Sequence, residues 1–398
     1  MRLLILSFYF PPDLSAGSFR TKALVDALRR ARPDIEIDVI TTMPNRYHSH
    51  SQKAGHFEDI AGVRITRIPL QAHKSGMLDQ SRVFIDFARQ VLALTKGRQW
   101  PVVYATSSRL MTAALGSVVA RRTRAKLYLD IRDLFTDTMK DVLSRSAMRH
   151  LLWPFSLVER LTFRSAQRVN LVSEGFLDHA RAVAPAQSFR TFTNGIDPEF
   201  LESSFSTPAE APAGPLQVLY AGNIGEGQGL HLVLPAAAKA LAGKVHFTIV
   251  GDGGRRAALE QALADAGVDN VTLAMPVPRE QLFAHYCAAD MLFLHLNDHS
   301  AFLKVLPSKI FEYGATGKPI LAGVGGYAAR FLADNIEGSA VFAPCDAKGM
   351  VTALEKLTSK PWHGDRSAFR QVYARAAIMD GLAADILAVA ERPQETKR

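Results

Sequence analysis

Two stretches of the chain, one at its start and one near its middle, repeat the same order of local signals. The apolar run Leu3–Phe8 leads into a turn-rich stretch, 11–18, and then into a helix-like segment. The apolar run Leu216–Ala221 leads into a glycine-rich stretch, 222–229, and again into a helix-like segment. A strand, a glycine-rich turn and a helix in this order open doubly wound α/β domains. The sequence therefore predicts an α/β fold with two Rossmann-like domains and a cleft between them.

Further short apolar runs alternate with helical stretches after each opening, as buried parallel strands do. In the first half they are Ile35–Thr41, Val63–Pro69, Val102–Ala105, Lys126–Leu129, Arg168–Val172 and Ser188–Thr191. In the second half they are Val245–Val250, Val271–Leu273, Met291–Leu294, Pro319–Ala322 and Ala340–Phe342.

The expected domain boundary is a linker at residues 203–215, which is rich in Pro, Ala, Ser and Gly and has no periodic apolar face. It separates an N-terminal domain, 1–202, from a C-terminal domain, 216–375. Residues 376–398 are expected to form a helix that packs back towards the N-terminal domain, followed by a frayed tail.

Composition excludes several classes of protein. The two cysteines, Cys287 and Cys345, form neither a disulfide framework nor a zinc-site spacing. No apolar run is long enough for a transmembrane helix, and residues 1–10 are expected to be a buried strand and not a signal peptide. No Asp-x-Asp triplet, His/Cys metal spacing, GxSxG motif or P-loop is present, so we expect no metal and no cofactor beyond a co-substrate.

Glycine-rich turns at strand ends are the first candidate binding elements. Their backbone N–H groups are open to close approach by phosphate groups, at Gly17 and Ser18 in the first turn and at Gly225 and Gly229 in the second. A third turn, 251–256, adds Asp252, Gly253 and Arg255, and either Arg255 or Arg256 is placed to meet a phosphate. Ordinary tight turns and surface charges are the alternative interpretation of these stretches.

Charged residues at the end of an expected strand are the second candidate. Asp130, Arg132 and Asp133 place two carboxylates around one guanidinium. Such carboxylates orient an acceptor hydroxyl if they face a cleft, whereas a buried ion-pair network is the alternative.

The stretch 307–323 (PSKIFEYGATGKPILAG) is the third candidate. Pro307 and Ser308 are expected to start a helix, with Ser308 as its N-cap, and Glu312 lies one turn inside. A carboxylate there is placed to accept both hydroxyls of a ribose.

Taken together, these motifs resemble the retaining glycosyltransferase family 4, which has the two-domain GT-B architecture. The chain is most similar to the branch that builds bacterial surface polysaccharides, including fucosamine- and N-acetylfucosamine-type transferases. The matching pieces are SFYFPPDLSAGSFR, DIRDLF, SEGF, TNGID, YAGNIGEGQGL, IVGDGG and PSKIFEYGATGKPI, in the expected order over nearly the whole length.

This resemblance implies roles for single residues. Gly17 would approach the donor diphosphate, Glu312 would hold the ribose, and backbone amides of Ser308 and Lys309 would meet the phosphates. The backbone of Met275–Val277 would contact the base. Asp133 and Arg132 stand where relatives carry a pair facing the transferred sugar.

The chain also departs from the family pattern. Lys304 stands where members carry the first of two glutamates, and Asn223 and Gln228 replace the usual Arg and Lys of the second turn. Lys304, Lys309 or Arg255 would have to supply the missing positive charge. The implied donor site comprises Gly17, Ser18, Asn223, Gly225, Gln228, Gly229, Asp252, Gly253, Arg255, Val277, Lys304, Pro307, Ser308, Lys309 and Glu312, and the implied catalytic residues are Asp130, Arg132 and Asp133.

The expected activity is metal-independent transfer of a sugar from a nucleoside-diphosphate donor to a hydroxyl of a lipid-linked saccharide in O-antigen or capsule synthesis. The expected donor is UDP-N-acetylhexosamine or a deoxy derivative. The C-terminal domain would bind the donor and the N-terminal domain the acceptor. Two alternatives stay open: a sugar-nucleotide epimerase or phosphorylase on the same fold, and a degenerate subunit that binds a partner transferase.

Charge is unevenly distributed along the chain. Residues 1–198 hold 29 Lys and Arg against 17 Asp and Glu, whereas residues 199–398 hold 18 against 21. Candidate partners of the basic half are an anionic membrane and a phosphorylated acceptor, and a solubilising surface is the alternative; nucleic acid is disfavoured because no basic–aromatic platform is present. The stretch 140–168 suggests a basic amphipathic helix, with Arg160, Arg164 and Arg168 on one stripe, and core packing with a solvated face is the alternative. We expect a cytoplasmic protein, peripheral on the inner face of the plasma membrane.

Overall fold

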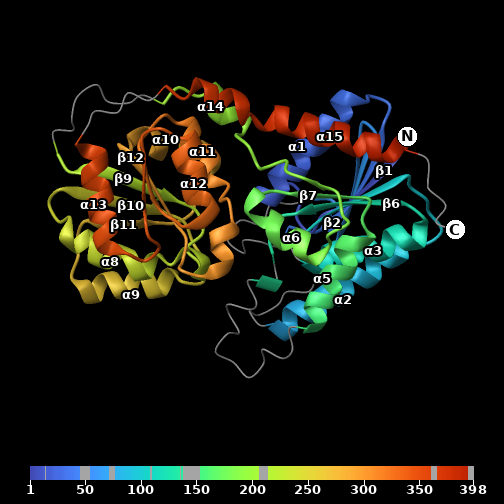
Figure 1. Cartoon of the computed structure of the whole chain (residues 1–398), viewed down its shortest axis with the longest axis horizontal. Coiled ribbons are helices and arrows are strands. Elements are labelled where there is room, and N and C mark those ends of the chain that lie inside the picture. Colours follow the sequence, from blue (N-terminus) through green and yellow to red (C-terminus); the bar gives the residue numbers. More distant parts are fainter. Residues whose placement is uncertain are drawn as a thin grey trace. The chain divides into compact units, whose positions relative to one another are not determined.

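The computed structural model describes residues 1–13, 15–44, 54–70, 77–107, 110–134, 136–137, 153–205, 214–359 and 365–392. Within them the chain forms two compact units (Figure 1). Unit 1 is Met1–Asn194 with Arg375–Arg398, and unit 2 is Gly195–Ala374. Each unit is a sheet covered by helices, which confirms the predicted class of two doubly wound α/β domains.

Unit 1 contains an eight-stranded sheet in the order β3-β4-β2-β1-β5-β6-β7-β8. All described neighbours are parallel except β3 and β4, which form a hairpin. The strands are β1 (Arg2–Leu6), β2 (Glu36–Thr42), β3 (Phe57–Ile60), β4 (Val63–Ile68), β5 (Val102–Thr106), β6 (Lys126–Ile131), β7 (Arg168–Leu171) and β8 (Phe189–Arg190). The helical segments are α1 (Ala16–Ala31), α2 (Met77–Leu94), α3 (Leu110–Thr123), α5 (Trp153–Ser165), η2 (Glu174–Phe176), α6 (Leu177–Val183) and α15 (Arg375–Glu391).

Helix α15 belongs to unit 1 although it lies at the far end of the sequence. Met379, Leu382 and Ile386 are fully buried in the same cluster as Leu24 and Leu28 of α1, and the two helices run side by side in Figure 1. At its carboxyl end, the ammonium of Lys126 donates to backbone carbonyls of the last turn, including that of Val389 at 2.9 Å. A cation at the carboxyl end of a helix also interacts favourably with the helix dipole.

Unit 2 contains a six-stranded, all-parallel sheet in the order β11-β10-β9-β12-β13-β14. Its strands are β9 (Leu216–Ala221), β10 (Val245–Val250), β11 (Val271–Ala274), β12 (Met291–His295), β13 (Ile320–Gly323) and β14 (Ser339–Phe342). The order reverses between β9 and β12, and ligands of such sheets bind outside the carboxyl ends of the strands at that point.

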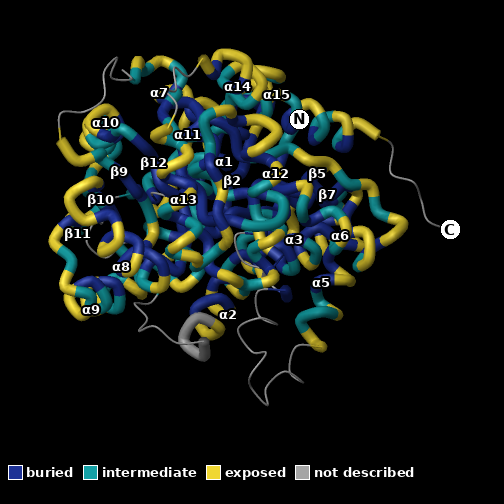
Figure 2. Tube along the Cα trace, turned by 60° about the vertical axis from the view of Figure 1, so that its left-hand side comes forward, coloured by how far each residue is buried: buried dark blue, intermediate teal, exposed yellow. Residues whose placement is uncertain are grey.

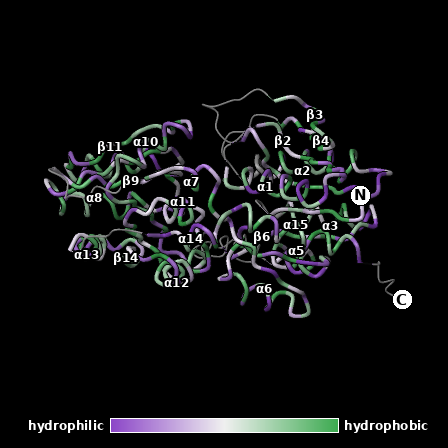
Figure 3. The backbone as a smooth tube through the Cα atoms, turned by 90° about the horizontal axis from the view of Figure 1, so that it is seen from above, coloured by the Kyte–Doolittle hydropathy of each residue, from purple (hydrophilic) through white to green (hydrophobic). Residues whose placement is uncertain are grey.

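Helices cover both faces of this second sheet. They are α7 (Pro198–Glu202), η3 (Glu226–Gln228), α8 (Leu230–Ala240), α9 (Arg256–Ala266), α10 (Arg279–Ala288), η4 (Ser300–Lys304), α11 (Lys309–Ala315), α12 (Gly326–Asn335), α13 (Ala347–Thr358) and α14 (Ser367–Val372). The central strands β12 and β13 are buried along their whole length, whereas the outer helix α9 buries Leu259 and Leu263 and exposes much of its other side (Figure 2). The trace of α13 likewise alternates between hydrophilic and hydrophobic residues, with Met350, Ala353 and Leu354 buried (Figure 3).

Two features of the fold differ from the sequence expectations. Strand β3 was not expected; it pairs with β4 through a tight turn in which Ala61 and Gly62 both have positive φ. The first unit ends at Asn194 and the second begins at Gly195, earlier than the expected linker at 203–215. Ile196 bridges to Ala374, which ties this stretch to unit 2. Residues 206–213 of the expected linker lie outside the described residues.

Candidate active site

The glycine-rich turn after β9 forms one wall of the candidate site in unit 2. A Cβ on Gly251 would lie 1.8 Å from the carbonyl oxygen of Gly222, and one on Gly253 would lie 2.5 Å from that of Ile224. Gly251 and Gly253 therefore allow the turns after β9 and β10 to touch backbone to backbone. Ile224 N–H donates to the carbonyl of Asp252 at 2.9 Å, which fixes the two turns together.

Asn223 and Gln228 lie on this turn and bind each other. The Gln228 side-chain oxygen accepts from Asn223 Nδ2 at 2.7 Å and from the backbone N–H of Gly225 at 3.2 Å. The turn is thus closed by neutral groups, and neither residue supplies the positive charge that Arg and Lys supply in the family pattern. Gly229 follows in the left-handed conformation, with φ of 57°.

His295 supports this turn from β12, a role that the sequence did not suggest. Its Nδ1 donates to the carbonyl of Gln228 at 2.6 Å, and its Nε2 accepts from the backbone N–H of Cys345 at 2.9 Å. The bond from Cys345 requires the neutral ring, because a protonated Nε2 cannot accept. Burial lowers the pKa of His295 to about 4, against the opposing effect of the Gln228 carbonyl.

The turn after β10 carries the charged residues Asp252 and Arg255. Asp252 caps the next residue, since its Oδ1 accepts from the N–H of Gly253 at 2.8 Å. Arg255 is half exposed and pairs with Glu226. Arg256 donates to the carbonyls of Gly251 at 2.6 Å and Ala274 at 3.1 Å.

Glu312 is half-buried on α11, beside the same edge of the sheet. The hydroxyl of Tyr286, from α10, lies 3.3 Å from its Oε2. Burial raises the pKa of Tyr286 well above its usual value, and the Glu312 carboxylate adds to this shift. Tyr286 is thus a neutral donor that orients the carboxylate, and sequence reasoning missed it because an apolar helix position gives no sign of its hydroxyl's partner.

Lys309 lies one helical turn before Glu312 and extends over the end of β9. Its Nζ is 3.9 Å from the centre of the Tyr220 ring. A Cβ on Gly222 would lie 2.3 Å from Lys309 Cε. Burial lowers the pKa of Lys309 to about 7, and Glu312 opposes the shift. The turn, the ammonium and the Glu312 carboxylate therefore share one edge of unit 2.

The remaining predicted donor residues occupy the approaches to this edge. Ser308 does not act as the expected N-cap: its backbone is helical and its side chain caps no N–H. Pro307 precedes it and accepts from the N–H of Ile310 at 3.1 Å. Lys304 ends η4 and is half-buried. Val277 packs on the core beside α10, while Met275 is 54% exposed.

In unit 1, Gly17 lies at the start of α1, where Ser15 caps the helix by accepting from Ser18 N–H at 3.1 Å. A Cβ on Gly17 would lie 2.7 Å from Nη1 of Arg132. That nitrogen is buried and has no hydrogen-bond partner among the described residues. Burial lowers the pKa of Arg132, and the nearby Arg20 also lowers it. A helix start and an unsatisfied guanidinium N–H therefore adjoin at the carboxyl edge of the sheet.

Asp130 and Asp133 have different surroundings although the sequence groups them. The Asp130 carboxylate is wholly buried, and Arg20 binds both of its oxygens, at 3.0 and 2.9 Å. Asn170 donates to Oδ1 at 2.6 Å. Asp133 is exposed. The structure thus gives Asp130 a buried ion-pair network, the alternative that the sequence left open, and leaves Asp133 accessible.

The predicted basic stripe on the segment 140–168 is only partly present. Residues 138–152 lie outside the described residues. Helix α5 ends at Ser165, so Arg168 is not on it; Arg168 begins β7, is buried and lies 3.4 Å from Asp385. Arg160 and Arg164 are exposed on α5.

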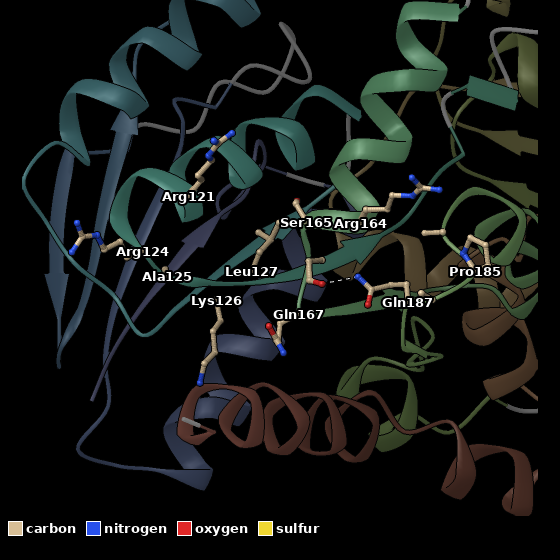
Figure 4. A pocket seen from close by; sticks show the side chains of 13 residues that line it. Arg121, Arg124, Ala125, Lys126, Leu127, Arg164, Ser165, Gln167, Pro185 and Gln187 are labelled. Atoms are coloured by element: carbon tan, nitrogen blue, oxygen red, sulfur yellow. Dashed lines mark hydrogen bonds between the residues drawn. The ribbon is translucent and has the colours of Figure 1, made fainter. Parts of the chain in front are cut away.

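A basic cavity of about 1040 Å³ lies at the opposite, amino-terminal edge of the unit 1 sheet. Arg121, Arg124 and Arg164 line it, but Figure 4 shows their guanidinium groups pointing in different directions. Lys126 is bound to the carbonyls of α15. These cations do not converge on one ligand position, so the carboxyl edges of the sheets remain the candidate site.

Two family models match the chain. One, described as "Glycosyl transferase 4-like domain", matches residues 17–195, and the other, described as "Glycosyl transferases group 1", matches residues 215–360. No curated protein sequence matches the chain.

Solved structures of the same fold cover nearly the whole chain. Sucrose-phosphate synthase from Thermosynechococcus elongatus is 17% identical with a TM-score of 0.70, covering 98% of this chain and 96% of its own. WaaG, a glycosyltransferase involved in lipopolysaccharide biosynthesis, is 13% identical with a TM-score of 0.62, covering 98% and 97%. A trehalose-6-phosphate protein from E. coli bound with UDP-2-fluoro glucose is 12% identical with a TM-score of 0.62, covering 98% and 97%.

Two Rossmann-like domains with these neighbours define the GT-B class of fold. The two family matches together span most of the sequence, and the chain belongs to the glycosyltransferases of the family 4 type. The protein is therefore a transferase enzyme.

Proposed function

We propose that the protein is a retaining glycosyltransferase that moves a sugar from a nucleoside diphosphate to a hydroxyl of a lipid-linked saccharide. The observation that carries this proposal is the position of the Glu312 carboxylate on α11, beside the glycine-rich turn and at the edge where the strand order of unit 2 reverses. A carboxylate there is placed to accept from the ribose hydroxyls of a donor whose phosphates lie at the turn.

The donor would lie across the turn after β9. At Gly222 the Lys309 side chain lies against the backbone of the turn, and Glu312, oriented by Tyr286, would accept from the ribose hydroxyls. The segment around Val277 would contact the base. The donor-binding residues that we propose are those implied by the family pattern. Among them, Asp252 and Arg255 would act by fixing the conformation of the turn after β10.

Catalysis would depend on stabilising the leaving diphosphate. Negative charge grows on it as the glycosidic bond breaks, so a preorganised cation and amides near it are the largest expected contribution. In unit 1, Arg132 and the exposed Asp133 are the proposed contacts of the transferred sugar or the acceptor. The leaving phosphate oxygen would take the proton of the acceptor hydroxyl. No metal has a role in this scheme.

The lipid-linked acceptor is supported by an exposed face of α5. Trp153, Leu157 and Leu161 follow one another at four-residue spacing and are 68%, 44% and 58% exposed. Arg160 and Arg164 are exposed on the same helix. Aromatic and aliphatic side chains beside arginines suit the interface of an anionic membrane. No helix among the described residues is long and apolar enough to cross a membrane.

We propose that the protein works at the cytoplasmic face of the plasma membrane in the synthesis of O-antigen or capsule, with UDP-N-acetylhexosamine or a deoxy derivative as donor. Incubation with a panel of nucleotide sugars and membrane extracts, in EDTA, tests the activity by transfer of label to the lipid fraction. Turnover of the donor without any acceptor would instead favour an epimerase or phosphorylase. Binding of no nucleotide at all would favour a subunit without activity.

A further inference from the structure

The edge of unit 2 that would receive a diphosphate has few cations available to it. Asn223 and Gln228 are neutral and bind each other. The two arginines of the turn after β10 are engaged: Arg255 with Glu226, and Arg256 with Glu260 and two backbone carbonyls. Phosphates bound here therefore need a positive charge from another element.

Lys309 is the cation that reaches this turn. It comes from α11, and its terminal atoms cross the backbone of Gly222 so closely that a Cβ there would lie 2.4 Å from Nζ. The face of the Tyr220 ring lies 3.9 Å away. The ring itself is fixed, because its hydroxyl donates to the carbonyl of Asn223 at 2.6 Å.

The ammonium is poorly compensated where it lies. Within the described part of the chain, Lys309 Nζ makes no hydrogen bond and no ion pair; the Tyr220 ring is its contact. Lys309 is half-buried, so its ammonium loses part of its hydration, which the ring face replaces only in part. An arriving phosphate would supply both the acceptors and the opposite charge.

We propose that the Lys309 ammonium binds the phosphate groups of the donor and takes up its proton as they arrive, an inference that rests on the proposed function. The affinity for the donor is then coupled to proton uptake at one side chain. The glycine at 222 is required for the same reason, because any side chain there would occupy the space of the lysine.

The direction of this coupling follows from the surroundings of Lys309. Burial lowers its pKa to about 7, while Glu312 is the charged group that opposes the shift. Tyr220 and Tyr313 stay neutral, since burial raises the pKa of each. Above neutral pH the free protein therefore holds a largely uncharged Lys309, and a bound phosphate restores its charge. Proton uptake on binding should rise, and affinity should fall, as the pH increases from 6 to 9.

Calorimetric titration with UDP tests this, in two buffers of different ionisation enthalpy at each pH. We expect uptake of about one proton at pH 8 and of far less at pH 6. The phosphate of UDP also takes up or releases protons on binding, and this part should be the same in both proteins. Lys309→Met should abolish the remaining proton uptake and should weaken UDP binding by about 10- to 100-fold. Uridine, which has no phosphate, should bind equally to both proteins.

Three controls make the outcome decisive. Lys239→Met removes an exposed lysine of α8 and should leave both affinity and uptake unchanged. Thermal unfolding shows whether Lys309→Met is folded; we expect it to be at least as stable as the natural chain at pH 6, because the methionine needs no charge there. Unchanged uptake in Lys309→Met, or its loss in Lys304→Met instead, would overturn the inference and spare the proposed function. If the natural chain binds no nucleoside diphosphate, both are overturned.

Discussion

Arg20 binds both carboxylate oxygens of Asp130, at 3.0 and 2.9 Å, with both side chains wholly buried. The guanidinium also donates to the carbonyls of Phe192 at 2.8 Å and Thr193 at 2.5 Å. The pair therefore joins α1, β6 and the segment after β8 inside unit 1. Opposite charge from Arg20 outweighs burial and keeps the pKa of Asp130 below its usual value.

The first prediction separates Asp130 from Asp133. Asp130→Asn leaves Arg20 as an uncompensated buried charge and should destabilise unit 1 by about 3–5 kcal/mol. Asp133→Asn changes an exposed residue and should alter stability by less than about 0.5 kcal/mol while lowering the rate of sugar transfer. Denaturant unfolding and initial rates of transfer measure the two effects. Loss of activity without loss of stability in Asp130→Asn would give Asp130 the chemical role and contradict this assignment.

The second prediction concerns Gly17. Alanine at this helical position favours the helix by roughly 0.5–1 kcal/mol over glycine, and the displacement of a buried group offsets this gain. Its Cβ would lie 2.7 Å from Arg132 Nη1, so the guanidinium has to move. We expect Gly17→Ala to be folded and slower in sugar transfer, and Arg132→Lys to be slow to a similar degree. Full activity in Gly17→Ala would show that the position of this guanidinium is unimportant.

The third prediction is a pH dependence from His295. Its pKa lies below its usual value of 6.5 in the folded protein, at about 4. The unfolded chain therefore binds the proton first, so this contribution to stability is complete above pH 6.5 and is lost as the pH falls towards 4. The loss amounts to about 3 kcal/mol. Thermal unfolding of His295→Gln should show a shallower fall of stability over this pH range, and an equally steep fall would contradict the role of the neutral ring.

The two sheets were predictable because each strand is a short apolar run between helices, and all but β3 were found. The site was predictable only in outline. Glu312 and the glycine turns stand out in the sequence, whereas the partners that orient them, Tyr286 and His295, come from other elements and give no local signal. The sequence could not separate Asp130 from Asp133 for the same reason, because the burial of Asp130 beside α1 is a property of the tertiary fold.

The fourth prediction tests the ribose contact. Glu312→Ala should weaken binding of UDP by about 10-fold or more, because the ribose hydroxyls lose a charged acceptor. Binding of inorganic pyrophosphate should change little. Tyr286→Phe should have a smaller effect in the same direction, since it removes the donor that lies 3.3 Å from Glu312. If Glu312→Ala binds UDP as tightly as the natural chain does, the ribose assignment is wrong.

The fifth prediction addresses the exposed face of α5. Replacing Leu157 and Leu161 by Ser removes apolar surface that is 44% and 58% exposed, so the fold should lose little stability. Arg160→Gln with Arg164→Gln removes the charge and leaves the apolar residues in place. We expect both double variants to float less with vesicles containing phosphatidylglycerol, and binding by the natural chain to weaken at high salt, because surface charges are screened.

As a matched control, Leu232→Ser with Lys239→Gln alters an exposed apolar residue and a cation on α8, and should leave flotation unchanged. If the natural chain does not float with anionic vesicles, α5 has another partner and the membrane proposal fails, whereas transfer to a water-soluble acceptor would still be measurable.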